Sequence, residues 1–447
     1  MRGAMQTTVG DDNKIRREDR AAHDWYRFVL SFPPHLVRAC AERFGLNPSK
    51  QMLDPFCGTG TTLVECKKLG LPSIGIEANP MAHFASRVKV DWNVSPERLL
   101  GHAAEVARLA LATLKAQGID DEPELPLFGR RNRGLSAPIL RALPEESRKL
   151  LLRDSISPLP LHKALVLRDA INELRDEAVS GHERLALART IVHDASNLQF
   201  GPEVGVGPSR KDAAVITPWM RCIKAMANDI NSLATWRHVE ATAYKADARQ
   251  ISHILGRQSV DAVITSPPYP NEKDYTRTTR LESVILEFIS SKDDLRGLKR
   301  SLVRSNTRGV YRGDTDDLLV ANHGEIQRIA HAIETRRMEL RKTSGFERQY
   351  ARVAKLYFGG MARHFAELRS VLRPGAYLAY VVGDQASYLR VMIRTGQLLA
   401  DIARPLGYQV EGIDLFRTRL ATATREALRE EVVVLRWPGS GSTSGGH

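Results

Sequence analysis

The chain has 447 residues, a hydrophobic content of 43% and a formal net charge of +13. The hydrophobic content is ordinary for a globular protein, and the length exceeds what one compact core usually holds. A positive balance of this size suggests a polyanionic partner, most simply nucleic acid, although a basic surface that serves only solubility would give the same count.

The cysteines and the apolar runs exclude several classes. The spacings of Cys40, Cys57, Cys66 and Cys222 match no zinc pattern, and the chain is too long for a disulfide scaffold. Reduced thiols in a cytoplasm fit this usage, so we predict a cytoplasmic protein without a metal site. The first 20 residues lack the apolar core of a signal peptide, and no apolar run approaches membrane-spanning length, so no membrane partner is expected.

The chain begins with a polar, charged stretch over residues 1–22, which we predict to be a flexible arm. A Pro33-Pro34 break and an amphipathic helix from His35 come next. Between the arm and the break lies an aromatic cluster: Trp25, Tyr26, Phe28 and Phe32.

A glycine-containing loop follows the first predicted strand, which ends at Met52-Leu53. The loop reads Asp54-Pro55-Phe56-Cys57-Gly58-Thr59-Gly60-Thr61-Thr62, and a helix is predicted over 61–69. Glycine tolerates positive φ and has no Cβ, so a ligand can approach the backbone here, where the first N–H groups of the helix also point. This is the nucleotide-cofactor position of an open α/β sheet. A dinucleotide site would need a third glycine, and none follows; an ordinary glycine turn is the alternative.

A second strand is predicted over 71–77. It ends in Glu77, and Ala78-Asn79-Pro80 follows. A carboxylate at the tip of this strand can accept both ribose hydroxyls of a nucleotide cofactor. The alternative is a glutamate that only caps the strand end.

Residues 96–238 interrupt the strand–helix alternation. Helical periodicity runs over 99–116 and 149–177, and the stretch is too long for a connection between two strands. We predict a helical insertion that either recognises nucleic acid or braces the core. A third strand over 239–244 follows, and then Asp247, which can be the N-cap of a helix over 248–255.

The strand predicted over 259–265 ends in Ser266-Pro267-Pro268-Tyr269. Two prolines stiffen the backbone, remove two N–H donors and leave carbonyl oxygens exposed beside an aromatic ring. Such an end suits a planar amine, with acceptors for its N–H bonds and a ring to stack on it. A proline-stiffened structural loop is the alternative. Asn271 and Tyr275 follow in a polar run that is well placed to line a target pocket.

Residues 281–355 form a second predicted insertion, mainly helical and basic. Its cations recur every three or four residues, so on a helix they would form one stripe that contacts phosphates, unless the stripe is only a solvated face. The cations are Arg296, Lys299, Arg300, Arg304, Arg308 and Arg312.

The core resumes over 356–437, with strands predicted at 376–382, 408–416 and 430–437 and helices at 361–371 and 393–405. Together with 23–95 and 239–280, these residues supply seven strands. Residues 438–447 are predicted to be a disordered tail.

Asp-Pro-Phe-x-Gly-x-Gly-Thr-Thr at 54–62 and Thr-Ser-Pro-Pro-Tyr at 265–269 resemble motifs I and IV of the S-adenosylmethionine-dependent amino-methyltransferases of DNA. The resemblance implies an α/β fold of class I methyltransferase (Rossmann-like) type, with a mostly parallel seven-stranded sheet whose last strand is antiparallel. It also implies that the segment before motif I covers one side of the cofactor.

The resemblance implies two groups of functional residues. Ser266, Pro267, Pro268 and Tyr269 would hold the exocyclic amine of a base flipped out of double-stranded DNA, and methyl transfer would be direct. An acidic residue at the place of Asp247 would approach the adenine of the cofactor. The residues expected at the cofactor are Asp54, Phe56, Gly58, Gly60, Thr61, Thr62, Glu77, Asn79 and Asp247, and those expected at the nucleic acid are Asn271, Tyr275, Lys299, Arg300, Arg304 and Arg308.

The serine of Ser-Pro-Pro-Tyr favours N4 of cytosine as the acceptor. Three alternatives stay open: N6 of adenine in DNA, a guanine amine in RNA, and a non-catalytic nucleic-acid-binding protein with the same fold. A cognate restriction endonuclease is a further expected partner.

Overall fold

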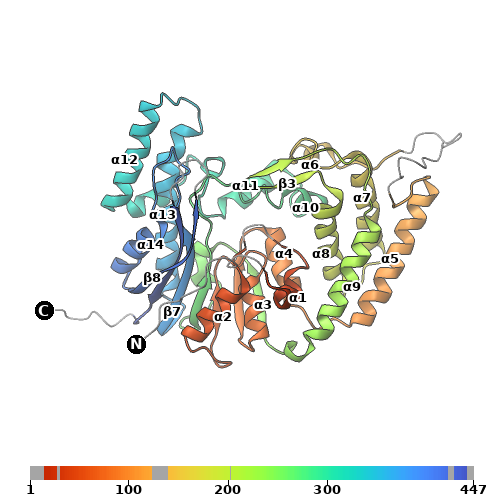
Figure 1. Cartoon of the computed structure of the whole chain (residues 1–447), viewed down its shortest axis with the longest axis horizontal. Helices are drawn as coiled ribbons and strands as arrows, with labels where there is room; N and C mark the ends of the chain where they lie inside the picture. Colours follow the sequence, from red (N-terminus) through yellow and green to blue (C-terminus); the bar gives the residue numbers. More distant parts are fainter. Residues whose placement is uncertain (1–14, 28–30, 123–138, 202, 421–426, 440–447) are drawn as a thin grey trace.

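The computed structural model describes residues 15–27, 31–122, 139–201, 203–420 and 427–439. The basic stretch Gly-Arg-Arg-Asn-Arg-Gly at 129–134 and residues 440–447 of the predicted tail lie outside these ranges. Figure 1 shows a central sheet with helices at both ends of the molecule, α5 (Pro96–Ala116) at one end and α12 (Gly324–Glu339) at the other.

A seven-stranded sheet organises the chain, in the order β5-β2-β1-β6-β7-β9-β8. All neighbours from β5 to β7 are parallel, and β9 runs antiparallel to both β7 and β8. The predicted fold class is therefore confirmed. The strands are β1 (Met52–Asp54), β2 (Ser73–Glu77), β5 (Ala241–Lys245), β6 (Val260–Thr265), β7 (Leu372–Gly383), β8 (Gln409–Leu420) and β9 (Ala427–Arg436).

Helices cover both faces of this sheet. Along β6, Ala262 and Ile264 face the apolar cluster of α2 (Pro34–Arg43) and α3 (Thr61–Lys68). Val263, between them, faces the cluster of α13 (Tyr350–Leu368) and α14 (Thr395–Ala403). Because both faces are buried, residues 262–264 of this strand read as a continuous apolar run in the sequence.

The first insertion is helical, as predicted, but it also carries a two-stranded antiparallel hairpin of β3 (Leu198–Phe200) and β4 (Val204–Val206). Its apolar side chains belong to one cluster with those of α4 (Pro80–Lys89), so insertion and core share a hydrophobic interior. Its helical elements are α5, α6 (Glu145–Arg148), α7 (Pro158–Glu173), α8 (Ser180–Thr190), η2 (Ile191–Ala195), α9 (Ile216–Ser232) and η3 (Ala234–Trp236).

The second insertion contains short helices and the start of α13, which begins at Tyr350 rather than at the predicted residue 361. Its basic residues do not lie on one helix, so the predicted continuous stripe is wrong: α11 ends at Arg300. The elements are α10 (Arg280–Ile285), α11 (Lys292–Arg300), η5 (Thr307–Gly309), η6 (Asp316–Val320), α12 and η7 (Glu347–Gln349). After β5 comes a short 3-10 helix, η4 (Ala248–His253), and before β8 comes η8 (Arg404–Leu406).

Residues 1–14 of the arm predicted to be flexible over 1–22 lie outside the described residues, and the described part of that arm, residues 15–22, contains helical structure. Arg17–Asp19 form η1, Arg20–His23 form α1, and Asp19 and Ala22 are buried. Trp25 Nε1 donates to Asp229 of α9 (2.8 Å). Contacts with a partner more than 200 residues away hold this segment, so local composition did not reveal its order.

Two searches of the described residues gave negative results. No helix among them is both long and apolar enough to cross a membrane. No group of three or more histidine, cysteine, aspartate or glutamate side chains among them is arranged to hold a metal ion.

Candidate active site

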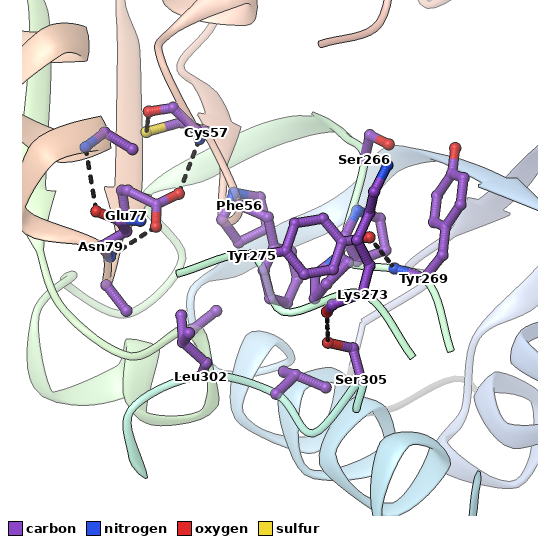
Figure 2. A pocket seen from close by; sticks show the side chains of 18 of the residues that line it. Phe56, Cys57, Glu77, Asn79, Ser266, Tyr269, Lys273, Tyr275, Leu302 and Ser305 are labelled. Carbon is purple, nitrogen blue, oxygen red and sulfur yellow. Dashed lines mark hydrogen bonds between the residues drawn. The ribbon is translucent and has the colours of Figure 1, made fainter. Parts of the chain in front are cut away.

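A cavity of about 390 Å³ lies at the carboxyl ends of the parallel strands (Figure 2). Four turns that follow strands contribute to its lining, and part of the second insertion closes it. These parts are Pro55–Thr59 after β1, Glu77–Asn79 after β2, Ala246–Ala248 after β5, Ser266–Tyr269 after β6, and Ser301–Asn306 of the insertion. The turn Ser31–Pro33 before α2 also reaches the cavity.

The two glycines of the first loop have different tasks. Gly58 has φ +51°, lines the cavity and has open space where a Cβ would stand. Gly60 has φ +85° and precedes α3; a Cβ there would lie 3.0 Å from Ser86 Cβ of α4. Gly58 therefore leaves room for a ligand, whereas Gly60 permits close packing of two helices and does not line the cavity.

Asp54 and Thr62, both expected at the cofactor, are buried away from the cavity lining. Asp54 accepts hydrogen bonds from the Thr62 hydroxyl (2.6 Å) and the Thr265 hydroxyl (2.6 Å), which joins β1, α3 and β6. Burial raises the pKa of the Asp54 carboxyl to about 6, although these bonds act in the opposite direction. Both side chains hold the loop in place, while Phe56 and Thr61 from the same loop do line the cavity.

Glu77 is the carboxylate that the cavity offers at the β2 end. Its Oε2 accepts from the Gly58 N–H (2.9 Å) and its Oε1 from the Asn79 N–H (2.7 Å). Burial raises the pKa of Glu77 to about 7, and these backbone donors partly counteract the rise. A carboxylate has about four acceptor sites, so Glu77 can still accept a further donor from a ligand.

Asn79 and Asp247 line the cavity and also cap helices. Asn79 Oδ1 accepts from the Met81 N–H (3.1 Å), and its Nδ2 donates to Thr279. Asp247 Oδ1 accepts from the Arg249 N–H (2.9 Å), as expected of an N-cap. The sequence left two roles open for Asp247, and the structure supports the capping role while placing the residue at the cavity.

The Ser-Pro-Pro-Tyr turn lies at the other end of the same cavity (Figure 2). The Ser266 hydroxyl donates to the Val381 carbonyl (3.0 Å), so its oxygen lone pairs remain for a ligand. The Tyr269 N–H donates to Tyr275 Oη (2.9 Å), which fixes the turn, and the Tyr269 ring lies beside Gly383. The turn thus presents oxygen acceptors and an aromatic ring together. Asn271 and Tyr275 also line the cavity, as expected.

The four cations expected at the nucleic acid, Lys299, Arg300, Arg304 and Arg308, separate into two pairs. Lys299 Nζ donates to Asp274 (2.9 Å), and Arg304 forms a two-pronged pair with Asp314 (2.9 and 2.7 Å). Arg304 is only 5% exposed, so its side chain stabilises the loop through Asp314 and does not face solvent. Arg300 and Arg308 are exposed.

The exposed pair, Arg300 and Arg308, stack on aromatic rings. The guanidinium of Arg300 lies 5.2 Å from the ring centre of Tyr311, and that of Arg308 lies 5.3 Å from Phe346. Neither forms an ion pair with an acidic side chain within the described residues. Of the four cations expected at the nucleic acid, these two are exposed and have no acidic partner in the described part of the chain.

Sequence reasoning missed the wall that Ser301–Asn306 form opposite the strand ends. Figure 2 shows Leu302 below Glu77 and Asn79, and Ser305 below Lys273 and Tyr269. The Ser305 carbonyl accepts from the Tyr388 hydroxyl (2.9 Å), which holds the wall to the core. No motif marks these residues, and the charge periodicity around them was the only signal.

Comparison with known sequences gives similarities to a family model and to curated relatives. A family model described as DNA methylase matches residues 7–86, which include the glycine loop and Glu77. The type II methyltransferase M.BsoBI of Geobacillus stearothermophilus is 24% identical over 460 residues, covering 94% of this chain and 86% of that relative. M.AvaI, a type II methyltransferase of Nostoc sp., is 24% identical over 454 residues, covering 94% of this chain and 87% of its own.

Among solved structures, the crystal structure of TrmN from Thermus thermophilus aligns with a TM-score of 0.26 and 10% identity. The alignment covers 90% of this chain and 48% of that one.

Proposed function

We propose that this chain, which is related to the S-adenosylmethionine-dependent DNA methyltransferases of the N4/N6 type, transfers a methyl group to N4 of cytosine in double-stranded DNA. One observation carries the proposal. A single cavity has Glu77 and Gly58 at one end and the turn Ser266–Tyr269 at the other. In Figure 2, Phe56 and Tyr275 lie between these two ends. A methyl donor and an acceptor amine can therefore meet in one enclosed space.

The Glu77 end fits S-adenosylmethionine. The Glu77 carboxylate keeps acceptor capacity for a hydroxyl donor, and Gly58 leaves its surroundings open. The Thr59 hydroxyl oxygen is buried without a hydrogen-bond partner among the described residues, which leaves it for a ligand. When bound, S-adenosylmethionine supplies an electrophilic methyl group on a sulfonium centre. Phe56, Asn79 and Asp247 complete the end of the cavity that would hold it.

The turn after β6 orients the base. Ser266 Oγ and the Pro267 carbonyl accept the two N–H bonds of the exocyclic amine, and Tyr269 stacks on the ring of the base. The lone pair of the amine nitrogen then points along the cavity toward the Glu77 end. Holding two reactants in this geometry supplies much of the reduction in the barrier. The amine nitrogen would form the new N–C bond as the bond between the methyl carbon and the sulfonium sulfur breaks, with the electron pair staying on sulfur as a neutral thioether. One proton would leave the nitrogen to water, and no covalent bond to the protein would form.

The base must leave the helix to reach this turn, because the target amine is stacked inside a duplex. Flipping costs a few kcal/mol, which stacking on Tyr269 offsets in part. The neutral Ser266 acceptor, where related loops carry aspartate, favours cytosine over adenine. The similarity to type II methyltransferases supports a cognate restriction endonuclease as a partner.

Modification mapping of DNA from cells that express the chain, combined with transfer of a radiolabelled methyl group to DNA and to RNA in vitro, tests the proposal. We expect N4-methylcytosine in one sequence context and no label in RNA. Methylated adenine would replace the cytosine assignment, and label in RNA alone would replace the DNA assignment. No label on either, from a folded protein that binds S-adenosylmethionine, would contradict the proposed function.

A further inference from the structure

Arg249 occupies a junction that the proposed function does not use. It lies in η4, directly after the cavity residues Asp247 and Ala248, and its side chain is only 10% exposed. Its guanidinium bonds to Asp247 through two nitrogens, with Nε–Oδ1 3.0 Å and Nη2–Oδ2 2.7 Å. This two-pronged geometry fixes the plane of the Asp247 carboxylate. The Ala246 N–H donates to the Glu77 carbonyl (3.1 Å), so the pair lies beside the end of β2.

The other side of the same guanidinium holds the second insertion. Nη1 donates to Asp316 Oδ2 of η6 (2.8 Å), and Nη2 donates to the Arg300 carbonyl (2.8 Å) at the end of α11. The cavity wall, Ser301–Asn306, begins at the next residue. Asp316 is also paired with Arg363 of α13 (2.7 Å). Four charges, two positive and two negative, thus balance at this junction.

Two glycines of α13 lie against this junction. A Cβ at Gly359 would lie 1.8 Å from the carbonyl oxygen of Asp316, so only glycine lets the helix approach η6 this closely. A Cβ at Gly360 would lie 3.4 Å from Asp316 Oδ2 and 3.3 Å from a methyl group of Val303 in the wall. The helix, the junction and the wall are therefore in close contact.

We propose that Arg249 is a positioning residue that couples the two ends of the cavity. It sets the Asp247 carboxylate at the end assigned to the cofactor, and it anchors the wall that faces the catalytic turn. A ligand at either end restrains the same junction. The first ligand therefore already carries the loss of conformational entropy at the junction, and the second ligand binds more tightly. This inference rests on the proposed function, because it needs a cofactor at one end and a base at the other.

The test measures coupling with S-adenosylhomocysteine, which cannot donate a methyl group, and a DNA duplex that carries the mapped methylation sequence. For the wild type, we expect each ligand to lower the dissociation constant of the other by about 5- to 10-fold, and by the same factor in both directions. Asp316→Asn weakens only the insertion side of the junction. We expect it to bind each ligand alone like the wild type, with a coupling factor near one.

Two further variants complete the design. Arg249→Met should lose the coupling and also weaken S-adenosylhomocysteine binding, because Asp247 loses its orienting partner. Arg363→Met is the matched control: it removes another partner of Asp316 without touching Asp247 or Arg300, and should keep the coupling. Thermal melts exclude unfolding, and a merely structural Arg249 would lower stability without changing the coupling factor.

Two outcomes would overturn the inference while leaving the proposed function intact. In the first, the active wild-type enzyme has a coupling factor of one. In the second, Asp316→Asn and Arg249→Met both keep the coupling factor of the wild type. A wild-type protein that methylates nothing would instead contradict the proposed function, and the coupling inference would fall with it.

Discussion

Burial raises the pKa of the Glu77 carboxyl to about 7, which makes cofactor binding dependent on pH. Hydroxyl donors prefer the ionised form, so the affinity for S-adenosylmethionine should rise about tenfold between pH 6 and pH 8 as that form becomes the main one. Glu77→Gln should bind more weakly and lose this dependence. Calorimetric titrations across that range check it, and a flat profile for the wild type would contradict the assignment of Glu77.

The same pKa shift affects the stability of the ligand-free protein, which should fall as the pH rises, whereas the cofactor affinity should increase. The folded state keeps a proton on Glu77 that the unfolded chain releases above pH 4.5. This group's contribution to stability is therefore greatest at low pH and falls as the pH rises toward about 7. Glu77→Gln should remove that part of the decline, which thermal melts of the ligand-free proteins can measure.

Tyr269 carries a prediction that separates chemistry from cofactor binding. Tyr269→Ala removes the stacking platform, worth about 1–3 kcal/mol, and Ser266→Ala removes one acceptor for the amine. Both variants should bind S-adenosylmethionine nearly normally and lose most methyl transfer in single-turnover assays. Tyr269→Phe keeps the face of the ring and should retain much of the activity. Wild-type methylation by a folded Tyr269→Ala protein would refute the role of this turn.

At the residue scale, the sequence motif located the loop but not the direction of each side chain. Glu77, Phe56 and Ser266 face the cavity, as expected from their positions after strand ends. Asp54 does not, because its carboxylate accepts a hydrogen bond from the hydroxyl of Thr265, a residue 211 positions away in the sequence. Such a contact across the sheet has no signature in the local sequence.

At the scale of elements, the second insertion contains two kinds of cation: some face solvent, and others stabilise its loop through ion pairs. The double variant Arg300→Ala with Arg308→Ala should weaken DNA binding for all sequences. The slope of the logarithm of the binding constant against the logarithm of the salt concentration should also become shallower by about 2, since each lost phosphate contact removes roughly 0.9 from it. The melting temperature should stay near that of the wild type. Binding measured from 50 to 200 mM salt provides the test, and an unchanged slope would leave both residues as a solvated face.

Arg304→Ala is the contrasting variant. It leaves Asp314 partly buried without its partner and removes donors from the carbonyls of Lys299 and Leu302. Breaking a buried pair from one side costs roughly 3 kcal/mol. We expect a lower melting temperature and a disturbed cavity wall, with a salt slope close to that of the wild type. Charge periodicity alone could not distinguish Arg304 from Arg300, because α11 ends between them.

At the scale of the whole molecule, the mostly parallel seven-stranded sheet could be predicted and the shared interior could not. Alternating strands and helices, with the last strand returning antiparallel, follow from apolar runs and the resemblance to a known fold. The apolar cluster that joins Trp25, α4 and the helices of the first insertion depends on contacts between distant segments. Asp229 of α9 accepts both the Trp25 indole N–H (2.8 Å) and the Ala22 N–H (3.2 Å), so one carboxylate connects the chain start to the insertion.

This shared interior predicts that core and first insertion unfold together. Asp229→Ala leaves two donors without their acceptor and should cost roughly 1–3 kcal/mol. Trp25→Phe loses one bond but keeps an aromatic ring, so it should cost less. Denaturant unfolding followed by far-ultraviolet circular dichroism and by the fluorescence of the five tryptophans, which lie in both core and insertion, should give coincident single transitions that shift together in Asp229→Ala. If the insertion were an independent domain, each signal would instead show two transitions, and only one of the two would move to lower denaturant in this variant.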